Sequence, residues 1–388
     1  MIPRLILCVA WPLGLAIWPV SDLSASVTPD EKPVEKANDE GAWKRYLPTL
    51  NGEVKARFEW NVNGDDARFA VRNARLRFNG YVSPLVSYRF FLDFNDNGHI
   101  TILDTYVVVK PGQFEFVFGQ QRADLDRSVN PYFFVNRSFL IKFLPTHYAV
   151  HYDRTASVRI QGWRDIGLQM GYTFRGGSLP WRVAFGVFNG AGMNSPEWSD
   201  KFSYAVRLEY GRRMDGIHCK GWYYDGWLGT LDRRELSAEG EVVETRFRQR
   251  VRMMACGAYY AHERMYFEVE GGARWFDGAE ATAMRVGYVQ GIYAFPFKRK
   301  TMLFKYVAPA LRWDVGSGIV FQNQERASLD AFSGSRMTFG LNLGLIERIM
   351  VSELRVNYEK FLFREKPSDL SSNRLLQNKL TLELCIQF

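Results

Sequence analysis

Long apolar runs are scarce in this 388-residue chain. The one exception, residues 5–20, is shorter than the roughly 18 apolar residues that a membrane-spanning helix requires. The mean hydropathy is −0.23 and charged residues make up 24% of the chain, which excludes a bundle of membrane helices. Hydrophobic residues make up 47%, which is too many for a disordered chain.

Cysteine and catalytic motifs are scarce as well. The chain has four cysteines and no C-x-x-C pair, which excludes a zinc ribbon and a dense disulfide framework. Neither a G-x-S-x-G motif nor a glycine-rich phosphate loop is present, so we expect no enzyme and no cofactor. His147 and His151 flank a non-helical segment, so no metal site is expected there. Residues 93–104 imitate a calcium loop, but strand-like flanks indicate a hairpin turn.

The first 45 residues differ from the rest of the chain. Arg4, the apolar run and the small residues 24–26 are typical of a secretory signal peptide, which we predict over residues 1–26. A short anchor helix is the alternative. Residues 27–45 are rich in proline, glutamate, lysine and aspartate, which predicts a flexible leader. We expect the folded domain to span residues 46–388.

After residue 50 the dominant pattern is an alternation of period two. Tyr204, Val206 and Leu208, for example, alternate with Arg207 and Glu209. One face of such strands is apolar and aromatic, and the other is polar, small or charged. Polar residues deep inside strands indicate a wet lumen, whereas a secreted β-sandwich would have a dry inner face.

The spacing of these segments predicts an all-β fold, a transmembrane antiparallel β-barrel of about 16 strands in the bacterial outer membrane. Residues 155–163 could add one more strand. Short turns alternate with longer loops, the longer ones being predicted at residues 121–164, 189–201, 225–243, 314–335 and 364–377. The predicted strands are residues 52–60, 67–81, 85–94, 100–110, 113–120, 165–174, 181–188, 202–211, 217–224, 244–260, 265–276, 282–295, 301–313, 336–345, 349–362 and 378–388.

An ordered set of short motifs resembles the phosphate-selective porin O and P family. The motifs are Leu92-Asp93-Phe94, Ile102–Val107, Asn136-Arg137-Ser138, Arg164–Gly167 and Phe188–Gly190. The resemblance implies an outer-membrane porin that is usually a homotrimer, with a long third loop folded inward as a constriction. It also implies selectivity for small anions such as phosphate or polyphosphate. In this family a terminal aromatic residue, here Phe388, is recognised by the barrel-insertion machinery.

Basic residues share the predicted inner face. An arginine facing lipid near the membrane midplane costs roughly 2–4 kcal/mol, so rows of arginines are expected to face water. Guanidinium groups bind phosphate oxygens through a bidentate fork. Alternatively, these arginines pair with acidic residues of the next strand, such as Glu268 and Glu270. The predicted pore-lining arginines of the strands are Arg75, Arg77, Arg89, Arg246, Arg248, Arg250 and Arg252.

The predicted third loop, residues 121–164, has seven basic and three acidic side chains, a net charge of +4. Inside a lumen this charge would focus an anion-attracting field. The alternative is a surface loop with solvated charges. The loop's predicted anion-binding residues are Arg122, Arg127, Arg137 and Lys142.

The sequence therefore predicts a passive outer-membrane porin for small anions, without a cofactor, a metal ion or a nucleic-acid partner. A general, weakly selective porin is the nearest alternative. An outer-membrane hydrolase on a barrel scaffold is a further alternative.

Overall fold

The chain divides into two units, Met1–Ala42 and Trp43–Phe388, and every residue that the structure describes belongs to the second. The predicted signal peptide and nearly all of the predicted leader lie outside the described residues, so both stay predictions. The computed structural model describes residues 46–64, 66–96, 99–124, 133–144, 164–177, 179–190, 192–194, 201–212, 215–236, 242–276, 283–298, 303–323, 328–347, 351–367 and 376–388.

The described part of this second unit is a single closed sheet with one short helix, α1 (Phe139–Phe143). The strands are β1 (Thr49–Asn61), β2 (Asp66–Ser83), β3 (Val86–Asp96), β4 (His99–Val109), β5 (Phe114–Arg122), β6 (Arg164–Phe174), β7 (Trp181–Phe188), β8 (Ser203–Gly211), β9 (Gly216–Leu236), β10 (Val242–His262), β11 (Met265–Phe276), β12 (Met284–Tyr293), β13 (Phe295–Pro296), β14 (Tyr306–Asn323), β15 (Ser328–Gly344), β16 (Glu353–Glu365) and β17 (Lys379–Gln387).

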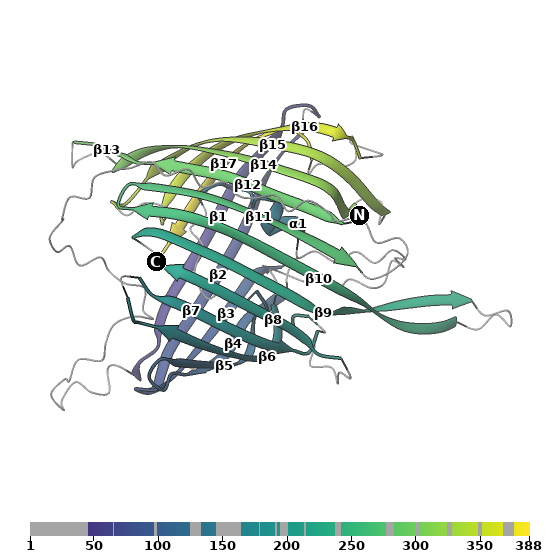
Figure 1. The fold of residues 1–388 in the computed structure, drawn as a ribbon. Coiled ribbons are helices and arrows are strands. Elements are labelled where there is room, and N and C mark those ends of the chain that lie inside the picture. The colour runs from purple at the N-terminus through teal and green to yellow at the C-terminus, as the bar shows by residue number, and fades with distance from the viewer. Residues whose placement is uncertain are drawn as a thin grey trace, which may run out of the picture. The chain divides into compact units, whose positions relative to one another are not determined.

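Antiparallel pairing between chain neighbours runs around the whole sheet, and β1 pairs with β17 to close it. The two residues of β13 continue β12, because both pair with β14. Counted that way, the wall has sixteen strands, which confirms the predicted antiparallel barrel. Figure 1 shows the strands running obliquely around the barrel.

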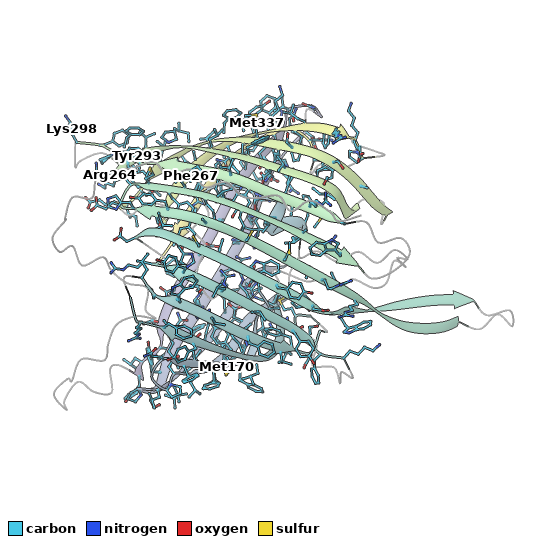
Figure 2. The ribbon with its side chains drawn as sticks, in the orientation of Figure 1. Met170, Arg264, Phe267, Tyr293, Lys298 and Met337 are labelled. Atoms are coloured by element: carbon cyan, nitrogen blue, oxygen red, sulfur yellow. The ribbon has the colours of Figure 1, made fainter. Side chains whose placement is uncertain are left out.

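The period-two pattern separates an apolar outer face from a polar inner face. On β8, Tyr204 is 47% exposed whereas Arg207 is 2% exposed. Met170 and Phe267, labelled in Figure 2, are also large exposed apolar side chains. A closed barrel leaves no unpaired strand edge, so this apolar outer face can contact lipid without exposing backbone polar groups.

Two predicted loops are largely strand. Residues 225–243 and 314–335 contain glycine and aspartate, which favoured loops, but β9 pairs with β10 and β14 with β15 across most of both ranges. The register shifts between Gly316 and Ile319, and Gly318 has φ +61°, so these glycines form a bulge within a continuing strand.

The two ends of the barrel differ. Arg264 and Lys298, labelled in Figure 2, lie in short connections that follow β10 and β13. Phe388 exchanges backbone hydrogen bonds with Gly52 at that same end of the wall. In outer-membrane barrels short turns face the periplasm and longer loops face outward. The connection from β5 to β6 therefore starts from the outward end.

Candidate functional site

The inner face of β14, β15 and β16 carries a buried network of ions. Asp314 accepts hydrogen bonds from Arg312 Nε at 2.9 Å and from Arg336 Nη2 at 2.9 Å. Arg336 Nη1 also donates to Glu359 Oε1 at 3.0 Å. All four side chains are almost fully buried. Buried ions of this kind need complete pairing, because an uncompensated charge in a low-dielectric site is strongly unfavourable.

The same network holds part of the connection between β5 and β6, which we call the inner segment (Phe133–Leu144). The backbone N–H of Phe139 donates to Asp314 Oδ1 at 2.8 Å. Arg336 Nη2 donates to the carbonyl of Arg137 at 2.6 Å, and Asn357 accepts from the N–H of Val135 at 2.7 Å. The wall thus satisfies backbone groups that would otherwise lack partners.

The helix α1 lies inside the inner segment and is stabilised at both ends. Ser138 caps its first turn by accepting a hydrogen bond from the N–H of Ile141 at 3.3 Å. Arg274 of β11 donates to the carbonyls of Phe143 at 3.1 Å and Leu144 at 3.2 Å. A cation at a helix C-terminus also complements the helix dipole.

The inner segment lies against the inner face of the wall, far around the barrel from the strand that precedes it in the chain. β5 ends at Arg122, yet the hydrogen bonds of the inner segment reach β14, β15 and β16. Whichever way one counts around the sheet, at least six strands separate β5 from β15. Its anchors are polar side chains of the face opposite to the exposed apolar side chains, so residues 133–144 lie on the inner side of the wall. An inward fold of the whole third loop, and its role as a constriction, stay predictions. The remaining predicted loop residues, 125–132 and 145–163, lie outside the described ones.

Three predicted arginines lie on the inner face of β2 and β3. Arg75 Nε donates to Asp93 Oδ2 at 2.7 Å, so this guanidinium is paired with a carboxylate. Arg89 Nε donates to Asn79 Oδ1 at 2.8 Å, and its guanidinium lies 5.5 Å from the ring centroid of Tyr106. Both residues lie where the period-two pattern predicted them.

Arg77 lies between these two arginines and differs from both. Its guanidinium lies 4.6 Å from the ring centroid of Phe91. Its Nε atom is buried and has no hydrogen-bond partner among the described residues. Within that part of the chain no carboxylate oxygen lies within 4.0 Å of Arg77. The inner wall of β2 therefore presents a positive charge that the described residues leave without a carboxylate partner.

Glu268 and Glu270 of β11, the proposed partners for inward-facing arginines, are instead held by a lysine. Lys220 Nζ of β9 lies 2.9 Å from Glu268 Oε1 and 2.8 Å from Glu270 Oε2. Tyr288 donates a further hydrogen bond to Glu270 at 2.9 Å. The two glutamates and Lys220 are all buried, so this part of the wall carries paired charge.

The predicted row of inward arginines on β10 is wrong for Arg250 and Arg252. Val251 and Met253 are fully buried and belong to the core around α1, so the odd positions face the lumen. Arg252 shares the even positions with Met254, which is 49% exposed on the outer face. Parity alone could not tell which face was inner, because apolar residues that pack against the inner segment resemble lipid-facing ones.

The other predicted residues have mixed outcomes. Arg122 Nε donates to Asp124 Oδ1 at 3.0 Å at the start of the third loop. Arg137 contributes its backbone carbonyl to Arg336, as described above. Arg127 lies outside the described residues, and the structure does not describe the side chains of Lys142, Arg246 and Arg248. Pore-lining roles for these four stay predictions.

Phe388 is 64% exposed, and its backbone pairs with that of Gly52 at distances of 2.7 and 3.1 Å. Its ring covers Gly52 so closely that a Cβ on Gly52 would lie 2.1 Å from the ring. Phe388 therefore contributes to closure of the barrel, and recognition by the insertion machinery stays a prediction.

The sequence reasoning missed the buried ions of β14–β16. The sequence did carry a signal for them. In the predicted strand 349–362, four successive residues that share one face are all polar. These are Glu353, Arg355, Asn357 and Glu359.

No group of three or more potential metal ligands occurs among the described residues. In the same part of the chain, no helix has the length and apolar character needed to cross a membrane.

No family model matches the sequence, and a search of curated proteins found no match either. Solved structures do match in fold. An anion-selective porin from Comamonas acidovorans is 10% identical, with a TM-score of 0.54 over 88% of this chain and 98% of that one. The in-vitro folded outer membrane protein OmpT of Vibrio cholerae, in its trimer form, is 10% identical, with a TM-score of 0.51 over 88% and 100%. Salmonella typhi OmpF in complex with daunomycin is 12% identical, with a TM-score of 0.51 over 88% and 97%.

At these identities the likeness concerns the fold. A closed sixteen-stranded barrel with an apolar outer face and a charged lumen has the architecture of outer-membrane porins. The chain is thus a porin-type β-barrel of the bacterial outer membrane. Membership of the phosphate-selective O and P family stays a prediction.

Proposed function

We propose that this barrel is a passive channel for small anions, with phosphate among its solutes. The observation that carries the proposal is Arg77, a guanidinium on the inner wall with no carboxylate within 4.0 Å among the described residues. A guanidinium stays charged at any ordinary pH and offers phosphate a bidentate fork. A fixed positive charge in a pore lowers the barrier for anions and raises it for cations.

The inner segment supports this proposal by occupying part of the lumen. Its described residues include four phenylalanines that pack against the walls: Phe133, Phe134, Phe139 and Phe143. This packing fills the lumen beside β11–β16, so solutes would pass nearer to the basic wall of β2 and β3. The distance matters because two unit charges 4 Å apart interact by about 1 kcal/mol even in bulk water. An energy of this size changes an equilibrium constant about fivefold.

The test is the zero-current potential of single channels in a potassium chloride gradient, before and after replacing chloride by phosphate. The account predicts anion preference in the unmodified protein and a loss of about fivefold in the anion-to-cation ratio in Arg77→Gln. Arg285→Gln is the matched control, because it removes the same charge from the outer face: Arg285 is exposed and lies opposite Ala273, which in turn lies opposite the outward-facing Met254.

Four results would count against the proposal. Cation preference in the unmodified protein would contradict it, and equal permeability would favour the general, weakly selective porin. An unchanged potential in Arg77→Gln would remove Arg77 as the selective group. Hydrolysis of an ester or peptide substrate by the purified barrel would favour the hydrolase alternative.

We also propose that the barrel is a homotrimer, on the ground that the similar OmpT structure is described as a trimer. Crosslinking of the protein in its native membrane tests this, with monomers alone as the contrary result.

A further inference from the structure

One aromatic ring interrupts the polar inner face of β3. Between residues 86 and 94, the inward positions of this strand are Ser87, Arg89, Phe91 and Asp93. Phe91 is 9% exposed, whereas its neighbour Phe90 is 43% exposed on the lipid-facing side. Among the described residues, Phe91 is a member of none of the three clusters of buried apolar side chains. Packing in an apolar core therefore does not account for a phenylalanine at this position.

Three guanidinium groups surround the ring of Phe91. Arg77 is directly opposite Phe91 in the pairing of β2 with β3, and its guanidinium carbon lies 4.6 Å from the ring centroid. The guanidinium carbons of Arg75 and Arg164 lie 5.8 and 6.0 Å from the same centroid. An aromatic face attracts a cation within about 6 Å of its centroid. One ring of β3 is thus a shared contact of arginines from β2 and β6.

The three arginines differ in what else holds them. Arg75 and Arg164 each donate a hydrogen bond to a carboxylate, at 2.7 and 2.6 Å. The guanidinium of Arg77 has neither a hydrogen bond nor an ion pair with any described residue. Its side chain is half-buried, so part of it remains exposed on the inner face. The ring of Phe91 is therefore the contact that fixes the direction of the Arg77 guanidinium.

Stacking on a ring leaves the hydrogen-bonding edge of a guanidinium available. The group is planar, its N–H donors lie in that plane, and its face packs on an aromatic ring. Two parallel N–H groups match two oxygens of a phosphate or carboxylate, whereas chloride is a single acceptor atom. A fork that is already held in one direction loses less conformational entropy when an anion binds. A fixed fork therefore favours oxyanions more than it favours halides.

We propose that Phe91 is a positioning residue, which holds the N–H donors of Arg77 toward the lumen and thereby sets a preference for oxyanions over halides. The inference rests on the anion channel proposed above and adds a second level of selectivity to it. The charge of Arg77 favours anions over cations. The ring of Phe91 determines which anions gain most from that charge.

The test measures competition between phosphate and chloride in single channels of the full-length protein. Inorganic phosphate is added to a fixed potassium chloride solution, and the concentration that halves the chloride current is determined. Phe91→Leu keeps an apolar side chain but removes the aromatic face. A cation–π contact contributes about fivefold to an equilibrium constant, so this variant should need about fivefold more phosphate.

Two further variants separate positioning from packing. Phe91→Tyr keeps the aromatic face, so its half-blocking concentration should match that of the unmodified protein. Phe90→Leu is the matched control, because it removes the same ring from the lipid-facing side of the same strand, and it should change nothing. The zero-current potential of Phe91→Leu in a potassium chloride gradient should also stay unchanged, because the charge of Arg77 is kept.

A double-mutant cycle tests whether the ring acts through the guanidinium. Arg77→Lys keeps the charge but removes the fork, so it should raise the half-blocking concentration about as much as Phe91→Leu does. Combining Arg77→Lys with Phe91→Leu should then raise it no further. Effects that multiply in the double variant would overturn the inference, because the two side chains would act separately.

Other outcomes distinguish this inference from the function on which it rests. Equal half-blocking concentrations in Phe91→Leu and Phe90→Leu would overturn the positioning role, and so would a loss in Phe91→Tyr as large as that in Phe91→Leu. An anion-preferring channel in which phosphate does not compete with chloride would also overturn it, while the anion channel itself would stand. Cation preference in the unmodified protein would overturn both.

Discussion

Replacing Asp314 by alanine should release the inner segment from the wall. This one carboxylate accepts hydrogen bonds from the N–H of Phe139, from Arg312 and from Arg336. Its removal leaves the buried guanidinium groups of Arg312 and Arg336 with Glu359 as their one remaining carboxylate among the described residues, and it leaves one backbone N–H without an acceptor. The barrel wall itself should persist, because the backbone pairing of β14 with β12 and β15 does not involve this side chain.

The size of the effect follows from the burial of Asp314, which has no exposed surface. Removing one partner of a buried ion pair costs about 3–5 kcal/mol. Each increment of about 1.4 kcal/mol changes an equilibrium constant by about a factor of ten. The ratio of bound to released inner segment should therefore fall by roughly two to three and a half powers of ten. Asp314→Asn keeps an acceptor for Phe139 and should have a smaller effect.

Two assays read this change. Single-channel conductance should rise, because the inner segment no longer occupies the lumen. Amide hydrogen exchange over residues 139–144 should become faster, while exchange in the strands stays slow. The control is Asp225→Ala, which removes the carboxylate that pairs with Arg250 on the outer face at 2.8 Å. If Asp314→Ala folds and keeps both the conductance and the exchange of this control, the anchoring argument is wrong.

Three further predictions concern the wall. Lys220→Met leaves two buried glutamates uncompensated, so it should lower the free energy of unfolding by about 3 kcal/mol, measured by denaturant titration. Gly344→Ala should cost about 1–3 kcal/mol in the same titration, because its Cβ would collide with the buried ring of Tyr306, whereas Gly176→Ala meets nothing within 4 Å and should be neutral. Phe388→Ala should reduce assembly in cells, measured as folded protein per cell, more than it reduces refolding in detergent. If assembly and refolding fall equally, Phe388 acts only in closing the barrel.

The strand pattern of this chain could be predicted closely from the sequence. The alternation placed β7 at residues 181–188 and β11 at residues 265–276, with the bounds the structure has. Lipid on one side and water on the other impose opposite demands on successive residues, so period two is strong in such a wall. Glycine-containing stretches were misjudged, because Gly316 and Gly318 mark a bulge as readily as a loop.

The site was less predictable than the fold. Arg75, Arg77 and Arg89 were placed correctly on the inner face because their neighbours on the other parity are lipid-facing. Arg252 was misplaced, because Val251 and Met253 are apolar for a different reason: they pack against the inner segment. Contacts between a loop and a distant wall depend on the path of the loop through space, which periodicity does not encode.

The central claim is that Arg77 faces the path that anions take through the lumen. Its most direct test is thiol accessibility of Arg77→Cys, in a background in which Cys219, Cys256 and Cys385 are replaced by serine. The account predicts that a small anionic thiosulfonate modifies this position quickly and blocks current, and that a cationic reagent of equal size reacts more slowly. A position that neither reagent modifies, or that the cationic reagent modifies faster, would contradict it.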